Sequence, residues 1–554
     1  MPHDFDAIIV GSGPGGSTAA DILTAAGWSV VIFERGRNHL IDLDDPTQLL
    51  QDFSNDEIKF MDRWFLGPDP LLDPRTFRQS EGDGDRLHIG EVNNLPATVG
   101  GGGVHADGKV PRFREDDFRV LSDLGPIDDA ALADWPLSYD DLEPAYAEAE
   151  RLIGVAGEAG ANPFAAPRSG PFPMPPGAPM YASTLTVAAA ERLGYHPYPG
   201  PTAANSVPYD GRPACNNCGH CGYFGCPIHA KGDPVAPLRR ALLTGRATLR
   251  AQSFVSTILH RNGRASGVQW LDATGAVHTE SARYVVLAAG AMETPRLLLL
   301  SGFEHDQIGR NLMFHFQTFV LGQMPQRVHG HRGRSVTHLH DDHIIPDAAS
   351  MAAARAAGLP WFKGGMVEHA AASHPIMEAK HYPWGPSHKE AMRDSPMRDH
   401  LLGFCMQGED LPQATNRVDL DPTVRDVHGI PVARTTYRPH RHELVASEHY
   451  ADRLESIVRE TGAQRTIKTT SPRVGGPLSA THAKSSLIPA SRHVVGTARM
   501  GSDPRTSVCD PWGRVHAVPN VLIADSSLFP TAAGYGPTLT LVALAIRNMH
   551  ALTA

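Results

Sequence analysis

Three glycines near the start of the chain, Gly11, Gly13 and Gly16, have the spacing of a loop that binds the pyrophosphate of a dinucleotide. The first permits a tight turn, the second lets the backbone approach the phosphates, and the third lets a helix pack closely on the preceding strand. Glu34 ends the next apolar segment, at the place where a carboxylate binds a ribose hydroxyl. These residues predict dinucleotide binding, and they fit FAD and NAD equally well.

A second set of reactive side chains is a cysteine cluster in residues 215–226. Its members are Cys215, Cys218, Cys221 and Cys226. Four thiolates this close together could hold an iron–sulfur cluster, and the final Cys-Pro pair is typical of ferredoxins. They could equally hold zinc, form two disulfides or remain reduced thiols. A redox-active cluster would favour transfer of electrons to a carrier.

Four consecutive glycines, Gly100 to Gly103, precede Val104 and His105. Such a run does not form a stable helix or strand interior, so close approach of the backbone to a flat ligand is a good reason for it, and a surface loop is the alternative. The chain has 29 histidines, but no pair in residues 329–400 has a compelling metal-ligand spacing. We therefore expect those histidines to line a pocket or the surface.

The elements that must position these residues alternate between strand and helix at both ends of the chain. We expect strands at 7–10, 29–33, 284–290 and 520–525 and helices at 17–26 and 291–300. Residues 247–259 and 265–271 alternate like antiparallel strands, and 36–90 indicates irregular surface structure. Capping and periodicity predict helices at 138–152, 183–193 and 441–460, and 158–182 should be a long loop.

This pattern predicts an α/β protein, α+β overall, with a Rossmann-like dinucleotide domain and a discontinuous second domain on a largely antiparallel sheet. We assign 1–135, 200–315 and 486–554 to the first domain, and 136–199 and 316–485 to a substrate-binding domain. The net charge of −10 gives no basic footprint for nucleic acid. No apolar run approaches the roughly 20 residues of a membrane span. The first strand begins almost at Met1, so we expect no signal segment and a cytoplasmic protein.

Five motifs in order resemble one family. They are the N-terminal glycine motif, residues 93–103, Asp134-Trp-Pro-Leu-Ser138, residues 493–501 (HVVGTARMG) and residues 525–531 (DSSLFPT). Together they resemble the glucose–methanol–choline (GMC) flavoprotein oxidoreductases, on the side of the bacterial sugar and polyol dehydrogenases and pyranose oxidases. The resemblance covers nearly the whole chain and is weakest in 316–485. It implies that the dinucleotide is FAD.

The resemblance also implies roles for individual residues. Those expected to bind FAD are Gly11, Gly13, Gly16, Glu34, Gly100, Gly101, His105, Val255, Asp525, Gly536, Pro537 and Thr538. Val255 should contact adenine through its backbone, and Asp525 should have a positional role near the pyrophosphate and ribityl chain. His105 resembles the histidine that pyranose oxidases bond to the flavin, so covalent attachment is a hypothesis, with a histidine that only lines the flavin as the alternative.

Oxidation of an alcohol removes a proton from oxygen and a hydride from carbon, and the family position of the base is His493. The resemblance therefore implies hydride transfer from a CH–OH group to flavin N5, with a small-molecule alcohol as substrate and oxygen or a redox carrier as acceptor. The family's second His or Asn is replaced by Gly536. His493 could act alone, Tyr535 or a histidine of 316–485 could substitute, or a bulky substrate could need the space, which we favour. An FAD-containing lyase and an inactive flavin-binding scaffold are the alternatives.

Overall fold

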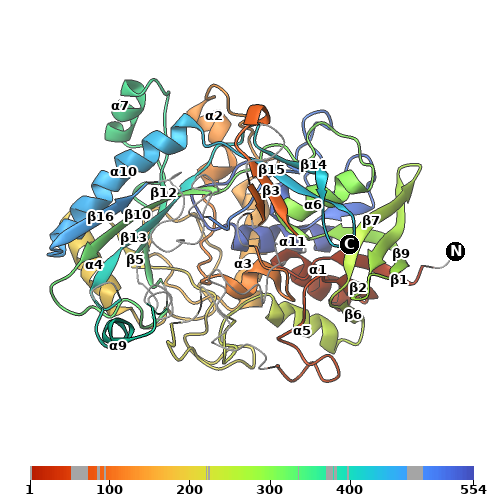
Figure 1. Ribbon diagram of the computed structural model, residues 1–554, viewed down its shortest axis with the longest axis horizontal. Coiled ribbons are helices and arrows are strands. Elements are labelled where there is room, and N and C mark those ends of the chain that lie inside the picture. Colours follow the sequence, from red (N-terminus) through yellow and green to blue (C-terminus); the bar gives the residue numbers. More distant parts are fainter. Residues whose placement is uncertain are drawn as a thin grey trace.

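The computed structural model describes residues 3–50, 73–83, 88–90, 92, 95–219, 221, 225–334, 336–369, 379, 383–395, 398–470 and 491–554. Asn93 and Asn94, in the second glycine motif, lie outside this set. Figure 1 shows two sheet-based halves side by side, with both termini in the half that contains β1 (Phe5–Val10). None of the described helices is both long and apolar enough to cross a membrane.

The first half is built on a mixed sheet of seven strands within the described residues. Its order is β6 (Ala247–Arg250), β2 (Val30–Phe33), β1, β9 (Val277–Leu287), β8 (Arg264–Leu271) and β7 (Phe254–Arg261), with β17 (Val521–Ile523) also on β9. The strands β6, β2, β1, β9 and β17 are parallel, and β8 and β7 are antiparallel. Their apolar side chains are buried, as expected for strands covered on both faces.

Helices surround this sheet, and the glycine loop leads into the first of them. They are α1 (Pro14–Ala25), α3 (Tyr139–Ile153), α5 (Val235–Leu243), α6 (Gly290–Leu300) and α11 (Thr538–Thr553). The helix α11 packs against both α1 and α3. Ser138 caps α3 by accepting from the amide of Asp141, as the sequence predicts, and the structure ends that helix at Gly154 in the left-handed region.

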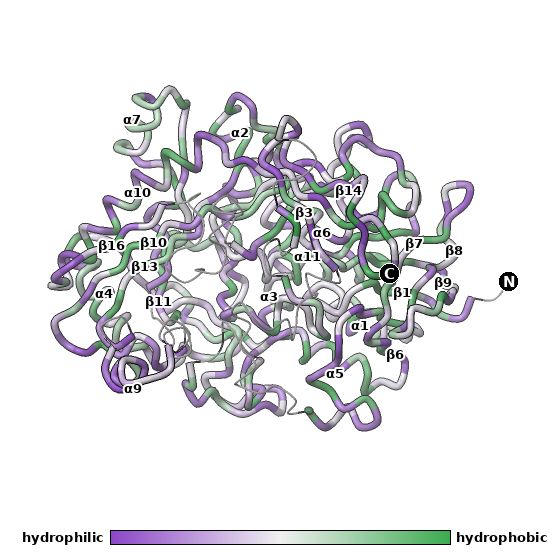
Figure 2. Tube along the Cα trace, in the orientation of Figure 1, coloured by the Kyte–Doolittle hydropathy of each residue, from purple (hydrophilic) through white to green (hydrophobic). Residues whose placement is uncertain are grey.

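The second half is an antiparallel sheet with the order β16 (Arg465–Thr469), β10 (His315–Gln323), β13 (Leu401–Glu409), β12 (Gly365–His369), β11 (His338–His340) and β5 (Tyr198–Pro199). One face packs against α10 (Arg441–Glu460) and α4 (Tyr181–Arg192) in a separate apolar core. Figure 2 shows hydrophobic residues along β10 and β13, whereas the peripheral α9 (Pro386–Arg393) is mainly hydrophilic. The predicted antiparallel sheet is therefore confirmed.

A third sheet connects the two halves. Its order is β14 (Arg417–Arg425), β15 (Pro431–Thr436), β3 (Arg75–Arg78) and β4 (His88–Gly90). It joins strands from both predicted domains, so the proposed domain boundaries stay a prediction. Short helices complete the described structure: α2 (Val120–Leu124), α7 (Ala348–Ala356), η1 (Glu81–Asp83), η2 (Gly101–His105), η3 (Glu115–Phe118) and η5 (Ser526–Leu528).

Two local expectations were wrong. Residues 247–250 form β6, which is parallel to β2, because the apolar segment extends the Rossmann-like sheet instead of starting a hairpin. The segment 36–90 contains β3 and β4, whose polar sequence hid their pairing with β15. The glycine run at 100–103 forms the 3-10 turn η2, which begins after Gly100 in the left-handed region, a conformation that glycine adopts without strain.

Candidate active site

The N-terminal glycine loop lies where β1 meets α1, with Gly11 at a φ of +100°. A Cβ added to Gly11 would lie 2.4 Å from the carbonyl oxygen of Ala288, and one added to Gly16 would lie 2.0 Å from the carbonyl oxygen of Gly11. A Cβ on Gly13 would meet no described atom within 4 Å. Gly11 and Gly16 are thus required by packing, whereas Gly13 borders open space beside the start of α1. That arrangement is the one expected of a pyrophosphate cradle.

The second glycine cluster lies against the first. The amide of Gly100 donates to the Ser12 hydroxyl at 3.0 Å, and a Cβ on Gly101 would lie 3.1 Å from the Cα of Gly13. Two backbone segments without side chains therefore face each other at the start of α1. A dinucleotide can approach both backbone segments closely, as predicted for Gly100 and Gly101.

Glu34 lies at the end of β2 and is almost fully buried. Its carboxylate accepts hydrogen bonds from the Ser12 hydroxyl at 2.7 Å and amide at 3.2 Å, and from the amide of Gly36 at 2.9 Å. These bonds hold the glycine loop and the end of β2 together. Its backbone carbonyl accepts from the amide of Ser253, which places the start of β7 and the buried Val255 beside this edge. The ribose and adenine contacts of Glu34 and Val255 stay predictions.

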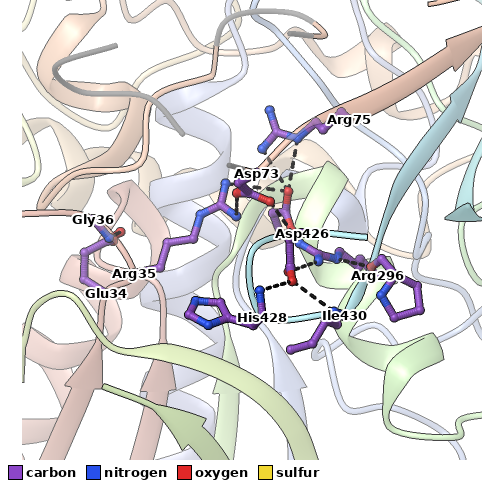
Figure 3. Close-up of polar contacts among 11 residues, drawn as sticks. Glu34, Arg35, Gly36, Asp73, Arg75, Arg296, Asp426, His428 and Ile430 are labelled. Atoms are coloured by element: carbon purple, nitrogen blue, oxygen red, sulfur yellow. Dashed lines mark hydrogen bonds and ion pairs between the residues drawn. The ribbon is translucent and has the colours of Figure 1, made fainter. Parts of the chain in front are cut away.

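Behind Glu34, a buried ion cluster fixes this edge of the sheet to the third sheet. Arg296 of α6 bonds Asp426 at 2.7 Å and Glu293 at 3.1 Å, and Asp426 also accepts from the amides of the turn between β14 and β15 (Figure 3). Glu293 in turn binds Arg75 of β3 at 2.8 Å. Charges that are this deeply buried need such partners, because an unpaired one is costly. The cluster therefore locks α6, β3 and the hairpin into one arrangement.

Asp525 follows β17 and holds two structural elements together. Its carboxylate accepts from the amide of Gly290 at 2.9 Å and the Thr294 hydroxyl at 2.5 Å on α6, and from the amide and hydroxyl of Ser527. Burial raises the pKa of Asp525 from its ordinary value, and these four donors oppose the rise. Asp525 thus anchors α6 and η5, and its expected place near the pyrophosphate and ribityl chain of FAD stays a prediction.

His105 ends η2 and is buried beside the glycine cluster. The loop that carries it is pinned by Lys231, whose ammonium donates to the carbonyls of Val104 at 2.7 Å, Ala106 at 3.0 Å and Cys221 at 3.2 Å. Lys231 lies just after the cysteine cluster. The cysteine-rich segment therefore supports the loop of His105, while covalent attachment at His105 stays a prediction.

The four cysteines do not form a metal-binding group in the structure. Among the described residues, they provide no set of three ligand atoms within 4.8 Å of one another. Burial raises the pKa of Cys221 to about 12, so without a bound metal this side chain is a neutral thiol. The iron–sulfur and zinc hypotheses for this segment therefore stay without structural support.

The predicted base, His493, contacts a second histidine that the sequence did not indicate. Nδ1 of His493 lies 2.9 Å from Nδ1 of His315, the first residue of β10, and the two rings are perpendicular. Nε2 of His315 lies 2.8 Å from the carbonyl oxygen of Ala533. Ala533 has a φ of +54°, a strained conformation for alanine, and its amide donates to Glu409.

These contacts define the tautomers of both rings. A carbonyl only accepts hydrogen bonds, so Nε2 of His315 carries a proton, and Nδ1 of a neutral His315 is then an acceptor. Nδ1 of His493 must donate to it. This leaves the lone pair of His493 on Nε2, where it can accept the proton of a hydroxyl group.

Both histidines are held neutral. Burial lowers the pKa of His315 to about 4. Burial, followed by the neighbouring His315 and Lys109, lowers the pKa of His493 well below its ordinary value. His493 is therefore in its basic form at neutral pH.

Gly536 borders His493 at the turn that starts α11, next to Pro537 and Thr538. A Cβ at Gly536 would lie 3.7 Å from the carbonyl oxygen of Lys109, 3.8 Å from Cε1 of His493 and 3.9 Å from Cε of Met366, which is ordinary contact. Glycine is thus not required by packing at this position. A side chain at this position would lie beside Cε1 of His493.

The structure shows the contacts of the two other candidates for a second polar group, Tyr535 and a histidine of 316–485. The hydroxyl of Tyr535 donates to Asp341 at 2.8 Å, in a buried cluster with Tyr198. The histidine beside His493 is His315, one residue before the range 316–485 that we considered. Its one sequence signal was a polar residue inside the apolar run from Phe314 to Phe316.

The face of the six-stranded sheet opposite α10 is polar and includes His315. Strand pairing puts Gln317, Gln407 and Glu368 on this same face. The amide of Gln407 donates to Glu368 at 3.1 Å and the amide of Gln317 donates to Gln407 at 3.1 Å. Lys109, whose charge acts on His493, forms an ion pair with Glu368 at 2.5 Å. A set of hydrogen-bonding side chains therefore lies beside the predicted base.

The chain is similar to several known proteins. Models of the GMC oxidoreductase family match residues 135–317 and 412–545. The chain is 29% identical to 2-methyl-1,2-propanediol dehydrogenase of Mycolicibacterium austroafricanum, over 98% of this chain and 94% of the relative. It is 30% identical to 6'''-hydroxyparomomycin C oxidase of Streptomyces lividus, over 99% and 91%. The structure of pyridoxine 4-oxidase from Mesorbium loti superposes with a TM-score of 0.61 and 17% identity, over 99% of this chain and 98% of that one.

Proposed function

Because the chain belongs to the GMC oxidoreductase family, its reaction is the FAD-dependent oxidation of a CH–OH group, and we propose that His493 is the base of this reaction. The two facing glycine clusters fit the cofactor, since Gly13 borders open space and Gly101 lies against it. We assign the pyrophosphate to Gly11, Gly13 and Gly16 and the flavin to the loop from Gly100 to His105. Bound FAD supplies the acceptor for the hydride.

The contact between His315 and His493 carries this proposal. It leaves Nε2 of His493 as an acceptor for a substrate hydroxyl, on a ring whose Cε1 lies beside Gly536. The hydroxyl proton passes to Nε2 as the carbon–hydrogen bond breaks. His493 then carries a positive charge, which the lone pair of His315 stabilises through the Nδ1–H hydrogen bond.

The polar sheet face supports a polyhydroxylated substrate, such as a sugar, glycoside or polyol. Gln317, Gln407 and Glu368 offer donors and acceptors for hydroxyl groups, and Lys109 balances the charge of Glu368. These groups already bond to one another, and their remaining donor and acceptor sites can bond the hydroxyl groups of a substrate. The similarity to one enzyme named for a diol and another named for an aminoglycoside supports the same class. Gly536 gives such a substrate space for a bulky group beside the reacting carbon.

We further propose a cytoplasmic location, which rests on the sequence expectation, and either oxygen or a redox carrier as the electron acceptor. The acceptor is identified by comparing the rate of flavin reoxidation by oxygen with the rate with a quinone or dye.

The proposed function is tested by anaerobic absorbance spectroscopy with sugars, glycosides, polyols and simple aliphatic alcohols. A polyhydroxylated substrate should bleach the visible band of the oxidised flavin, whereas a monohydric alcohol should do so far more slowly. The variant H493Q should retain FAD and reduce it about 100–10,000-fold more slowly. Rapid bleaching in H493Q would contradict the assignment of the base, and preference for monohydric alcohols would contradict the substrate class.

A further inference from the structure

A second cluster of ionisable side chains lies outside the active site, at the end of the six-stranded sheet. His329 and His331 belong to the loop after β10. Asp399 lies two residues before the start of β13. Ligand atoms of these three residues all lie within 4.8 Å of one another. In the part of the chain that the structure describes, no other group of three His, Cys, Asp or Glu residues meets this criterion.

The geometry of the cluster matches that of metal ligands. Nδ1 of His329 lies 3.6 Å and Nδ1 of His331 lies 3.7 Å from Oδ1 of Asp399. In a tetrahedral zinc site with bonds of about 2.0–2.1 Å, neighbouring ligand atoms are separated by about 3.3–3.4 Å. These two separations need to shorten by only a few tenths of an ångström, and the ligand nitrogens of the two histidines lie within 4.8 Å of each other.

The nitrogen of His329 has a further feature that points to a ligand. Its Nδ1 is buried and has no hydrogen-bond partner among the described residues, and it faces Asp399 at a distance too long for a hydrogen bond. His329 also has a φ of +48°, a conformation that costs energy for a side chain of this kind. The amides of Val328 and His329 both donate to the carbonyl of Asp399, which holds the loop in this position.

The other contacts of Asp399 orient its carboxylate. Oδ2 accepts from NH2 of Arg398 at 3.1 Å and from the amide of Ser395 at 3.4 Å, while Nε of Arg398 approaches Oδ1 at 3.3 Å. Nδ1 of His331 lies 3.4 Å from the carbonyl of Arg398, a long contact that a metal ion can replace. Oδ1 is thus directed toward the two imidazoles. Outer contacts of this kind commonly fix metal-ligating groups.

We propose that His329, His331 and Asp399 bind a divalent first-row transition-metal ion, for which Zn²⁺ is the appropriate probe. Two imidazole nitrogens and one carboxylate oxygen suit such an ion. The bound metal ties the loop after β10 to the start of β13, and water completes its coordination. The ion does not take part in the oxidation, because its ligands are separate from His493 and from the glycine clusters.

The test measures zinc in the full-length, FAD-loaded protein. The protein is stripped with a chelator, incubated with ZnCl₂, freed of excess metal and analysed for metal per chain. Wild type should retain about one zinc ion. The variants D399N and H329Q/H331Q should each retain less than about a tenth of that amount, with unchanged FAD content and substrate-dependent flavin reduction.

The variant C215S/C221S is the matched control, because the cysteine cluster is the other zinc-capable segment, and it should keep the zinc. A wild-type protein that retains no zinc would overturn the proposal, because the histidines would then only form ion pairs with Asp399. Loss of zinc in C215S/C221S but not in H329Q/H331Q would also overturn it. Should the double histidine variant fail to fold, D399N decides, since it changes one charge and almost no volume.

Discussion

His315 and His493 meet Nδ1 to Nδ1 at 2.9 Å, and the carbonyl of Ala533 holds the far nitrogen of His315 at 2.8 Å. Two imidazoles and one carbonyl thus form a chain in which each hydrogen bond has one possible direction. The strained backbone of Ala533 points its carbonyl into this chain. Both ring nitrogens of His315 are engaged in this chain, so His315 orients the predicted base and does not replace the substrate-binding group that is absent at Gly536.

Replacing His315 should reveal this dependence. In H315L, His493 loses its acceptor and can adopt the other tautomer, so the rate of flavin reduction should fall about 10–100-fold. In H315Q the side-chain oxygen can accept from His493 while the amide donates to Ala533, so much of the rate should return. Rapid-mixing absorbance measures both rates. Equal rates in H315L and H315Q would contradict a positioning role through hydrogen bonding.

The pH dependence should respond to Lys109. Burial lowers the pKa of His493 most, and His315 and Lys109 lower it further, so His493 stays in its basic form well below pH 6.5. The acid limb of kcat/KM should therefore lie below that pH, with activity lost as pH falls through the pKa of His493. In K109M a positive charge is removed and Glu368 loses its partner, so the acid limb should move upward by about one pH unit.

The control for this shift is K389M, because Lys389 lies on the peripheral helix α9. Its profile should match that of wild type. A downward shift of the acid limb in K109M, or an equal shift in both variants, would show that Lys109 does not act on the base.

The sequence predicted the parts of the site that local patterns encode. The glycine spacing of the first loop, the cap at Ser138 and the apolar periodicity of 441–460 all act within a few residues, and the structure has the corresponding loop and helices. His493 was found through a resemblance, because nothing in its own neighbourhood distinguishes a base from a core histidine.

The features that the sequence did not predict depend on contacts between distant segments. His315 and His493 are 178 residues apart in the sequence. They come into contact because the start of β10 lies beside the segment that follows residue 490. The strands β3 and β4 were missed for the same reason, since their polar sequence becomes a sheet only on pairing with β15. His329 and His331 gain their partner from Asp399, which is 68 residues beyond His331.

The buried ion cluster around Arg296 should matter for stability. In R296M, Asp426 loses its 2.7 Å partner and Glu293 loses one of its cations, inside a region with almost no solvent. Breaking such a pair costs about 3–5 kcal/mol, so the thermal midpoint should fall clearly. In R505M only an exposed pair with Asp503 is lost, and the midpoint should hardly change. Similar midpoints for the two variants would show that the cluster does not stabilise the fold.

Substitutions at Gly536 test why this position has no side chain. A Cβ there makes only ordinary contacts, at 3.7–3.9 Å, so G536A should fold, bind FAD and react almost as well as wild type. In G536N the amide group extends from a position beside Cε1 of His493, so kcat/KM for a bulky glycoside should fall about tenfold, and less for a small diol. Steady-state kinetics with the two substrates measure this difference. An increase in activity of G536N toward the bulky substrate would mean that the chain lacks a polar group there, and that Gly536 does not serve to make room.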